Sequence, residues 1–123
     1  MNMQSLQSQV DFLGRLISAA DVRQKVISQN IANVNTPNYQ RLQVDFEQLL
    51  LQEMKKTSGS VGPENQVTPV ISQTLGQTSR SDGNNVDIDQ EIGELNKNAL
   101  LQQVYLHLMR TELSEMKMAM TGS

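Results

Sequence analysis

The 123-residue chain contains no cysteine and no tryptophan, and aromatic residues make up only 3% of it. Without cysteine, the chain can form no disulfide bond, no thiolate metal site and no cysteine nucleophile. Because aromatic rings are so scarce, most of the buried surface must come from Leu, Ile, Val and the seven Met residues. The length suits one small domain. The composition therefore predicts a single domain, residues 1–123, with an aliphatic core.

Positive charge and long apolar runs are also scarce. The formal net charge is −3, whereas proteins that bind nucleic acid present a basic patch to the phosphates. No apolar run is long enough to span a bilayer. Residues 1–9 are polar and lack the basic start and apolar centre of a secretory signal. We therefore expect no nucleic-acid partner, no membrane-spanning helix and no cleavable signal peptide.

The sequence also lacks a recognisable catalytic or ligand-binding pattern. His107 is the only histidine, and an isolated histidine is a poor metal ligand or catalyst. There is no Gly-x-Ser-x-Gly elbow and no glycine-rich phosphate loop. The acidic stretch 82–89 does not follow EF-hand spacing, and a turn followed by a helix cap explains it better. We predict that the protein is not an enzyme and needs no cofactor, metal or small-molecule substrate.

What the chain does contain is two long apolar repeats. In residues 1–36, apolar positions alternate in steps of four and three, which is the a/d pattern of a coiled coil. At 1.5 Å per residue, this N-terminal heptad helix would be about 45 Å long. The positions of this first a/d series are Leu6, Val10, Leu13, Ile17, Ala20, Gln24, Ile27, Ile31 and Val34.

A second heptad helix is predicted over residues 86–123. Asp87, with Gln90 three residues later, has the spacing of a capping box. Leu101, Tyr105 and Leu108 lie beside the a/d positions, so this helix has a further face to bury. The second a/d series consists of Ile88, Ile92, Leu95, Ala99, Gln102, Leu106, Met109, Leu113, Met116 and Met120.

The middle of the chain is less regular. Residues 37–56 are expected to form a turn, an extended stretch at 41–44 and a short helix at 45–56. Residues 57–85 hold two of the three prolines and many Gly, Ser, Thr and Asn residues, so we expect a loosely structured segment. The predicted fold is all-α, with the two heptad helices paired as an antiparallel coiled coil. Two registers remain open, one with Gln24 opposite Ala99 and one with Gln24 opposite Gln102.

One stretch is more specific than composition or periodicity. Residues 30–39 read Asn-Ile-Ala-Asn-Val-Asn-Thr-Pro-Asn-Tyr. Pro37 disfavours a helix at the residue before it, so the first helix should end near Asn35 or Thr36. The string resembles the signature N-I-A-N-x-N/D-T-P-G-Y of bacterial flagellar rod and hook proteins. It departs from that signature at Asn38, where we expect a left-handed backbone because the family usually has Gly there.

The resemblance implies that this stretch is an assembly motif. Its predicted members are Asn30, Ile31, Ala32, Asn33, Asn35, Thr36, Pro37 and Tyr39. Family members are similar in plan, with both terminal helices forming a coiled-coil layer. From the heptad spacing, the principal packing positions are predicted to be Leu6, Val10, Leu13, Ile17, Ile27, Val34, Ile88, Ile92, Leu95, Leu106, Met109, Leu113 and Met116.

A second string narrows the resemblance. Residues 82–87, Asp-Gly-Asn-Asn-Val-Asp, resemble the D-G-N-x-V-D string before the last helix of type-B proximal rod subunits. The resemblance implies a structural subunit of the proximal rod, located in the flagellar basal body where the rod crosses the periplasm. Its partners would be its own copies, other rod proteins, the adaptor at the membrane ring and the flagellar type III export apparatus. Self-assembly of such subunits would transmit torque.

Two alternatives remain. The type-C proximal rod subunit usually has a proline-rich segment before its last helix, whereas no proline follows Pro69 here. A helical-hairpin adaptor or export chaperone would share the composition and the heptads, and only the 30–39 string favours the rod over it.

Overall fold

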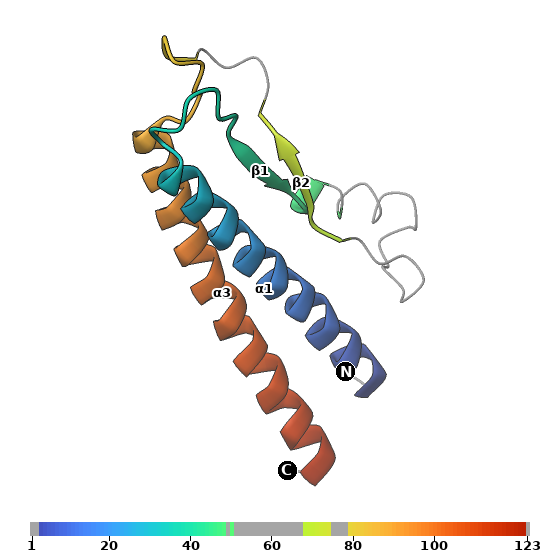
Figure 1. Cartoon of the computed structure of the whole chain (residues 1–123). Coiled ribbons are helices and arrows are strands. Elements are labelled where there is room, and N and C mark those ends of the chain that lie inside the picture. The colour runs from blue at the N-terminus through green and yellow to red at the C-terminus, as the bar shows by residue number, and fades with distance from the viewer. Residues whose placement is uncertain (1–2, 49, 51–67, 75–78, 123) are drawn as a thin grey trace.

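The computed structural model describes residues 3–48, 50, 68–74 and 79–122. Four elements follow one another along the chain: α1 (Met3–Ala32), β1 (Leu42–Asp45), β2 (Val70–Gln73) and α3 (Ile88–Thr121). Figure 1 shows the two long helices side by side, with the small sheet next to α1. The two long helices that the heptads predict are therefore present.

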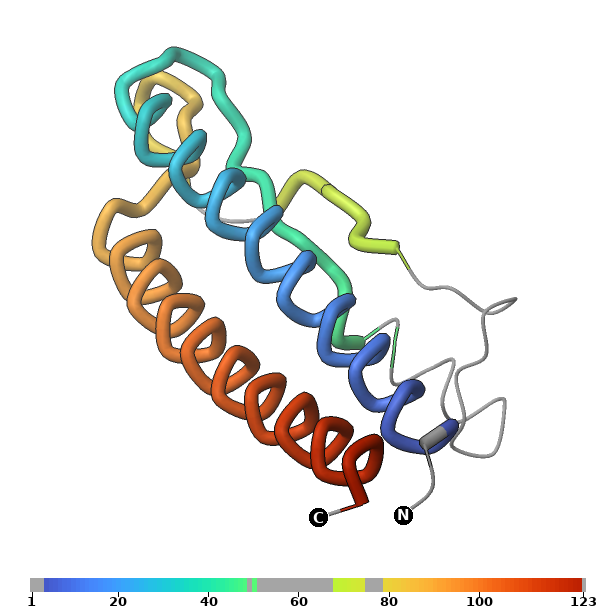
Figure 2. The backbone as a smooth tube through the Cα atoms, turned by 90° about the horizontal axis from the view of Figure 1, so that it is seen from below, coloured from blue at the N-terminus to red at the C-terminus, as the bar shows by residue number. Residues whose placement is uncertain are grey.

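The two helices run in opposite directions. Asn30, near the end of α1, donates a hydrogen bond of 3.1 Å to Glu91 at the start of α3. Nearer the middle of both helices, Asn98 donates to the carbonyl of Ala20 at 2.8 Å and to the side chain of Gln24 at 3.3 Å. Both chain ends consequently lie at the same end of the pair (Figure 2). Gln24 therefore contacts Asn98, the residue before Ala99, which agrees with the first of the two registers. The coiled-coil pairing itself stays a prediction.

Local signals explain where the helices begin and end. The carboxylate of Asp87 accepts from the N–H groups of Asp89 and Gln90, at 3.0 and 3.4 Å, so the predicted N-cap is confirmed. α1 ends at Ala32, slightly earlier than Pro37 alone suggests. At this end the backbone bonds tighten, with the N–H of Val34 donating to the carbonyl of Ile31, and the side chain of Asn33 adds a bond to the carbonyl of Gln29 at 2.8 Å.

The all-α prediction is wrong in one respect, because the chain also forms a two-stranded antiparallel sheet. The extended stretch expected at 41–44 corresponds to β1, but β2 lies within the segment expected to be loose. The strands pair from Leu42 opposite Gln73 to Asp45 opposite Val70. Ser72 also donates to Asp45 across the pair at 2.8 Å. The helix predicted at 45–56 lies largely outside the described residues, as does much of the segment 57–85.

The sheet is held against α1 by a second apolar stripe that the first a/d series did not include. Ala19, Phe46 and Leu50 form a buried cluster, against which three partly buried side chains pack, namely Phe12, Leu16 and Val44. Positions 12, 16, 19, 23, 26 and 30 repeat the steps of four and three, shifted by one residue from the first series. α1 therefore has two adjacent contact faces, one toward α3 and one toward β1.

The inner face of α3 is more polar than its a/d series suggests. Glu91 and Asn98 are buried against α1. Within the second a/d series, Leu95, Gln102, Met109 and Met116 are partly buried. The exposed members of that series are Ile88, Ile92, Ala99, Leu106, Leu113 and Met120.

We predict that Asp87→Ala lowers the free energy of unfolding by about 1 kcal/mol, because two N–H groups at the start of α3 lose their acceptor. Urea unfolding followed by circular dichroism measures this change. Asp87→Asn is the matched control, since Asn is an equally good N-cap, and it should unfold almost as the parent does. Equal losses in the two variants would contradict the capping role.

Candidate functional site: the junction between α1 and α3

The two sequence strings, 30–39 and 82–87, contact each other at one end of the helix pair. The buried side chain of Asn84 donates to the carbonyls of Asn33, Val34 and Thr36, at 2.8, 3.1 and 2.8 Å. Carbonyls at a helix end have no partner within the helix. Asn84 therefore caps α1 from a distant part of the sequence, while its own side-chain oxygen accepts from the N–H of Val86 at 2.8 Å.

The backbones of the two strings approach closely. Asn38 has φ 62°, which confirms the expected left-handed conformation, and its N–H donates to the carbonyl of Asp82 at 2.9 Å. Gly83 has φ 81°, and a Cβ atom added to it would lie 2.3 Å from Oδ1 of Asn38. Gln40 also donates to the carbonyl of Gly83 at 2.9 Å. A side chain at position 83 would be strained by the positive φ and would require the side chain of Asn38 to move.

Asn30 connects three elements. Its amide nitrogen donates to the carbonyl of Leu42 at 2.8 Å and to Glu91 at 3.1 Å. Its oxygen accepts from the N–H of Leu42 and from the hydroxyl of Tyr39, both at 3.0 Å. This fully buried amide uses both donors and accepts twice. Its two bonds to Leu42 take the place of a neighbouring strand on that edge of β1.

A buried ion pair completes the junction. The carboxylate of Glu91 accepts from Nε of Arg41, and neither side chain is more than slightly exposed. Arg41 also donates from Nη1 to Thr74 at 3.0 Å, and its backbone N–H donates to Asn85 at 2.6 Å. Burial, followed by the negative charge of Glu91, raises the pKa of Tyr39 above its ordinary value. The junction therefore holds a charged pair out of water with its hydrogen-bonding groups satisfied.

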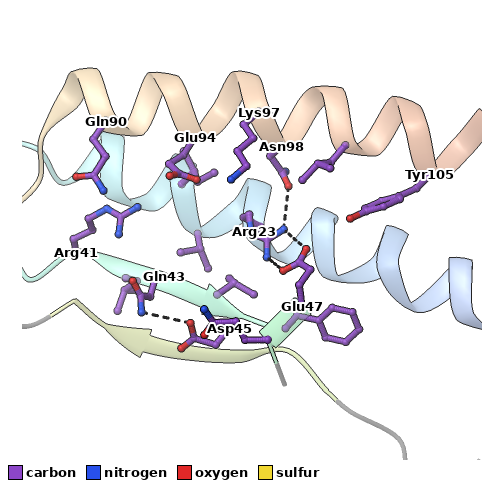
Figure 3. Close-up of a pocket in the computed structure, with 17 residues that line it drawn as sticks. Arg23, Arg41, Gln43, Asp45, Glu47, Gln90, Glu94, Lys97, Asn98 and Tyr105 are labelled. Carbon is purple, nitrogen blue, oxygen red and sulfur yellow. Dashed lines mark hydrogen bonds and ion pairs between the residues drawn. The ribbon is translucent and has the colours of Figure 1, made fainter. Parts of the chain in front are cut away.

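A groove of about 560 Å³ lies beside the junction, between α3 and β1, with α1 as its floor (Figure 3). Inside it, Arg23 pairs with Glu47 and lies 3.5 Å from the side-chain oxygen of Asn98. Burial alone raises the pKa of Glu47, but the hydrogen bonds and charge of Arg23 outweigh burial and hold that pKa below its ordinary value. Among the described residues, no group of three or more His, Cys, Asp or Glu could hold a metal ion.

The residues of the predicted assembly motif differ in how far they are exposed. Asn30 is buried, and Ile31, Asn33 and Tyr39 are partly buried. The exposed members are Ala32, Asn35, Thr36 and Pro37. In the first a/d series, Leu6, Leu13 and Ile27 are buried, whereas Val10, Ile17 and Val34 are partly buried.

Sequence reasoning missed several residues of the junction: Arg41, Asn84, Asn85, Glu91 and Asn98. Local sequence rules predict a turn and a helix cap at residues 82–87, and they do not indicate a contact with residues 33–36. A buried role for Glu91 and Asn98 had a weaker signal, their spacing of seven residues beside an apolar series.

Comparison with known proteins identifies the family of the chain. The family model described as "Flagella basal body rod protein" matches residues 17–40, which include the end of α1 and the whole of the junction's first string, 30–39. The chain is 36% identical over 119 residues to flagellar basal body rod protein FlgB of Bacillus subtilis, covering 89% of this chain and 91% of that protein. The chain belongs to the flagellar basal-body rod protein family.

Other relatives of this rod protein match over similar lengths. FlgB of Borreliella burgdorferi is 33% identical over 123 residues, with 87% of this chain and 88% of that protein covered. FlgB of Escherichia coli is 26% identical over 129 residues, with 93% and 94% covered. The family is one of structural proteins of the flagellar basal body, not of enzymes. Within the described ranges, no helix is long and apolar enough to cross a bilayer.

We predict that Asn84→Ala lowers the free energy of unfolding by about 2–3 kcal/mol, because three carbonyls lose their shared donor. Chemical unfolding of the isolated rod protein measures the loss. Asn96→Ala is the matched control, since Asn96 is exposed on α3 and its replacement should change stability by about 0.5 kcal/mol or less. Similar losses of stability in both variants would contradict the capping role of Asn84.

We also predict opposite effects at two glycines. Gly83→Ala should destabilise by about 1–2 kcal/mol, since an alanine is strained at this left-handed backbone angle and the side chain of Asn38 must also move. Gly93→Ala should stabilise by roughly 0.5–1 kcal/mol, because it lies within α3 with no atom within 4 Å of the added Cβ. Thermal melts of the two variants test both signs, and a neutral Gly83→Ala would show that the strings do not pack this closely in solution.

Proposed function

We propose that this rod protein is a subunit of the proximal rod that assembles with its own copies and with other rod proteins through α1 and α3. The chain matches relatives named FlgB over nearly their whole length, and the 82–87 string resembles that of type-B proximal subunits. The observation that carries the proposal is the outer surface of α3. Large apolar side chains are exposed there: Ile88, Ile92, Leu100, Val104, Leu106, Leu108, Leu113, Met118 and Met120.

Such a surface is unusual for a protein that works alone. Single exposed apolar residues are common, whereas nine large apolar side chains exposed on one helix indicate an interaction surface. The spacing of several of them follows a heptad, which suits packing against another helix. Each fully buried Leu or Ile contributes on the order of 1.5–3 kcal/mol. Covering this surface with neighbouring subunits would therefore stabilise both the subunit and the assembly.

The junction supports a mechanical role. Torque applied to the helices reaches the sheet through residues 33–41, a stretch that could bend if it were unsupported. The stretch is fixed by Asn84 on one side and by Asn30 and Glu91 on the other. Breaking a buried ion pair by removing one partner costs about 3–5 kcal/mol. We therefore propose that the junction is a stiff connection and that the rod transmits torque through it.

The proposed location is the rod where it crosses the periplasm, and the other proposed partners are the membrane-ring adaptor and the flagellar type III export apparatus. The junction agrees with export of an unfolded chain. Asn84 and Asn33 are 51 residues apart, so their contact forms only after both have left the exporter. The absence of cysteine means that no disulfide could close earlier.

We predict that Leu106→Ser with Leu113→Ser abolishes motility and rod assembly in cells that lack the parent gene, although the isolated subunit folds normally because both residues are exposed. Swimming assays and purified basal bodies give the result. The matched control is Asn96→Ser with Gln103→Ser, two exposed polar residues of the same helix, which should support normal rods. Normal rods with the leucine variant would refute assembly through this surface. An export chaperone, by contrast, would be missing from finished basal bodies.

A further inference from the structure

The strand β1 has one edge that β2 does not cover. In an antiparallel pair, every second residue of a strand bonds to the partner strand, and the residues between them direct their N–H and C=O groups the other way. The N–H of Thr74 donates to the carbonyl of Arg41 at 2.8 Å, which fixes this alternation. Leu42 and Val44 therefore direct their backbone groups away from β2.

Asn30 shows what kind of group this edge binds. Its side-chain amide donates to the carbonyl of Leu42 at 2.8 Å and accepts from the N–H of the same residue at 3.0 Å. A side-chain amide has the donor and the acceptor of a peptide unit. Asn30 therefore takes the place of one residue of a third strand, and Val44 is the next position along that edge. Within the described ranges, no side chain or loop bonds the N–H or C=O of Val44.

The edge at Val44 faces the groove between β1 and α3. The groove is lined by residues of α1, β1 and α3 and by none of the four residues of β2, so it lies on the uncovered side of β1 (Figure 3). The buried side chains of Val26 and Ile27 form part of its floor. An unpaired strand edge is a template for pairing with another extended chain. The groove thus combines such an edge with an apolar floor.

The dimensions and charge of the groove suit a short, uncharged peptide. Its α3 wall runs from Gln90 to Tyr105, about 22 Å at 1.5 Å per residue, which matches about six residues of extended chain. The charged residues that line it are Arg23, Arg41, Lys97, Asp45, Glu47 and Glu94. Three of these are basic and three are acidic, so a charged segment would gain no net attraction.

A different protein chain is a better source of such a segment than a second copy. Within the described ranges, the strands of this chain are β1 and β2, which already pair with each other. We propose that the groove binds an extended, uncharged segment of a different protein chain, which adds to β1 as a third strand. The backbone of the segment exchanges hydrogen bonds with Val44, and a small apolar side chain of the segment lies on Val26 and Ile27. In this mode of recognition, main-chain bonds supply affinity and a few side chains supply selectivity.

Amide hydrogen exchange at Val44 of the isolated protein tests the proposal without any rod assembly, so its outcome does not depend on the proposed function. The probe is the peptide Thr-Val-Thr-Val-Thr with acetylated and amidated ends. At about ten times its dissociation constant, the probe should slow exchange at Val44 about tenfold. The control peptide has the same side chains but a methyl group on every backbone nitrogen, so it has no N–H to donate and should leave exchange nearly unchanged. Equal slowing by both peptides, or no slowing by the probe at its solubility limit, would overturn strand pairing in the groove.

Two variants of α3 locate the binding site. Lys97→Trp places a large ring on the groove wall opposite β1 and should abolish the slowing. Asn96→Trp is the matched control, because Asn96 is exposed on the same helix and is not part of the groove lining. Both positions are exposed, so both variants should keep the circular dichroism of the parent. Equal slowing in the two variants would show that the peptide binds elsewhere. Slowing that rises with protein concentration in the absence of peptide would show that a second copy fills the groove, which would also overturn the proposal.

Discussion

A single buried carboxylate determines how the parts of this subunit fit together. An ionised side chain is very costly to bury without partners, and Glu91 is fully buried in α3. Its partners are Arg41, at the edge of β1, and Asn30, near the end of α1. Sliding α3 by one turn would separate all three and leave the charge unpaired, at a cost of about 3–5 kcal/mol. Apolar side chains at a and d positions tolerate such a slip far better, so the polar contacts set the alignment of the two helices.

Polar contacts also join the two sequence strings, residues 30–39 and 82–87. The turn after α1 leaves three carbonyls without helical partners, and the loop before α3 supplies Asn84 to bind them. Gly83 lets this loop approach Asn38 closely enough for those bonds to form. The carbonyls of Asn33 and Thr36 also accept from N–H groups within the turn, and Asn84 adds a donor that ties the turn to the second string. Together the two strings form one structure that fixes the angle between the helix pair and the sheet.

Features that depend on neighbouring residues were predictable from the sequence, and features that depend on distant residues were not. The cap at Asp87 and the left-handed Asn38 follow from local rules of helix starts and turns. β2 was missed because it is a four-residue strand among prolines and polar residues whose partner, β1, lies about 28 positions earlier in the chain, beyond the reach of local rules. The burial of Glu91 and Asn98 was missed because a periodicity argument assigns the inner face to apolar residues. The roles of the exposed motif residues and of the outer face of α3 remain predictions, since they concern contacts with other molecules.

α3 departs from the usual distribution of residues on a surface helix, because its two fully buried side chains are polar. Its inner face carries Glu91, Asn98 and Gln102, whereas apolar side chains such as Leu100 and Leu106 lie outside. Each buried polar group on the inner face is satisfied by a specific partner, so that face specifies one alignment within the subunit. The outer face has no such specific bonds, and it gains its free energy only when water is excluded by a neighbour. The buried polar groups thus provide specificity within the subunit, and we propose that the exposed apolar side chains of α3 provide stabilisation on assembly. If so, the free energy of unfolding should rise with the concentration of neighbouring subunits, as expected when partners bind only the folded state.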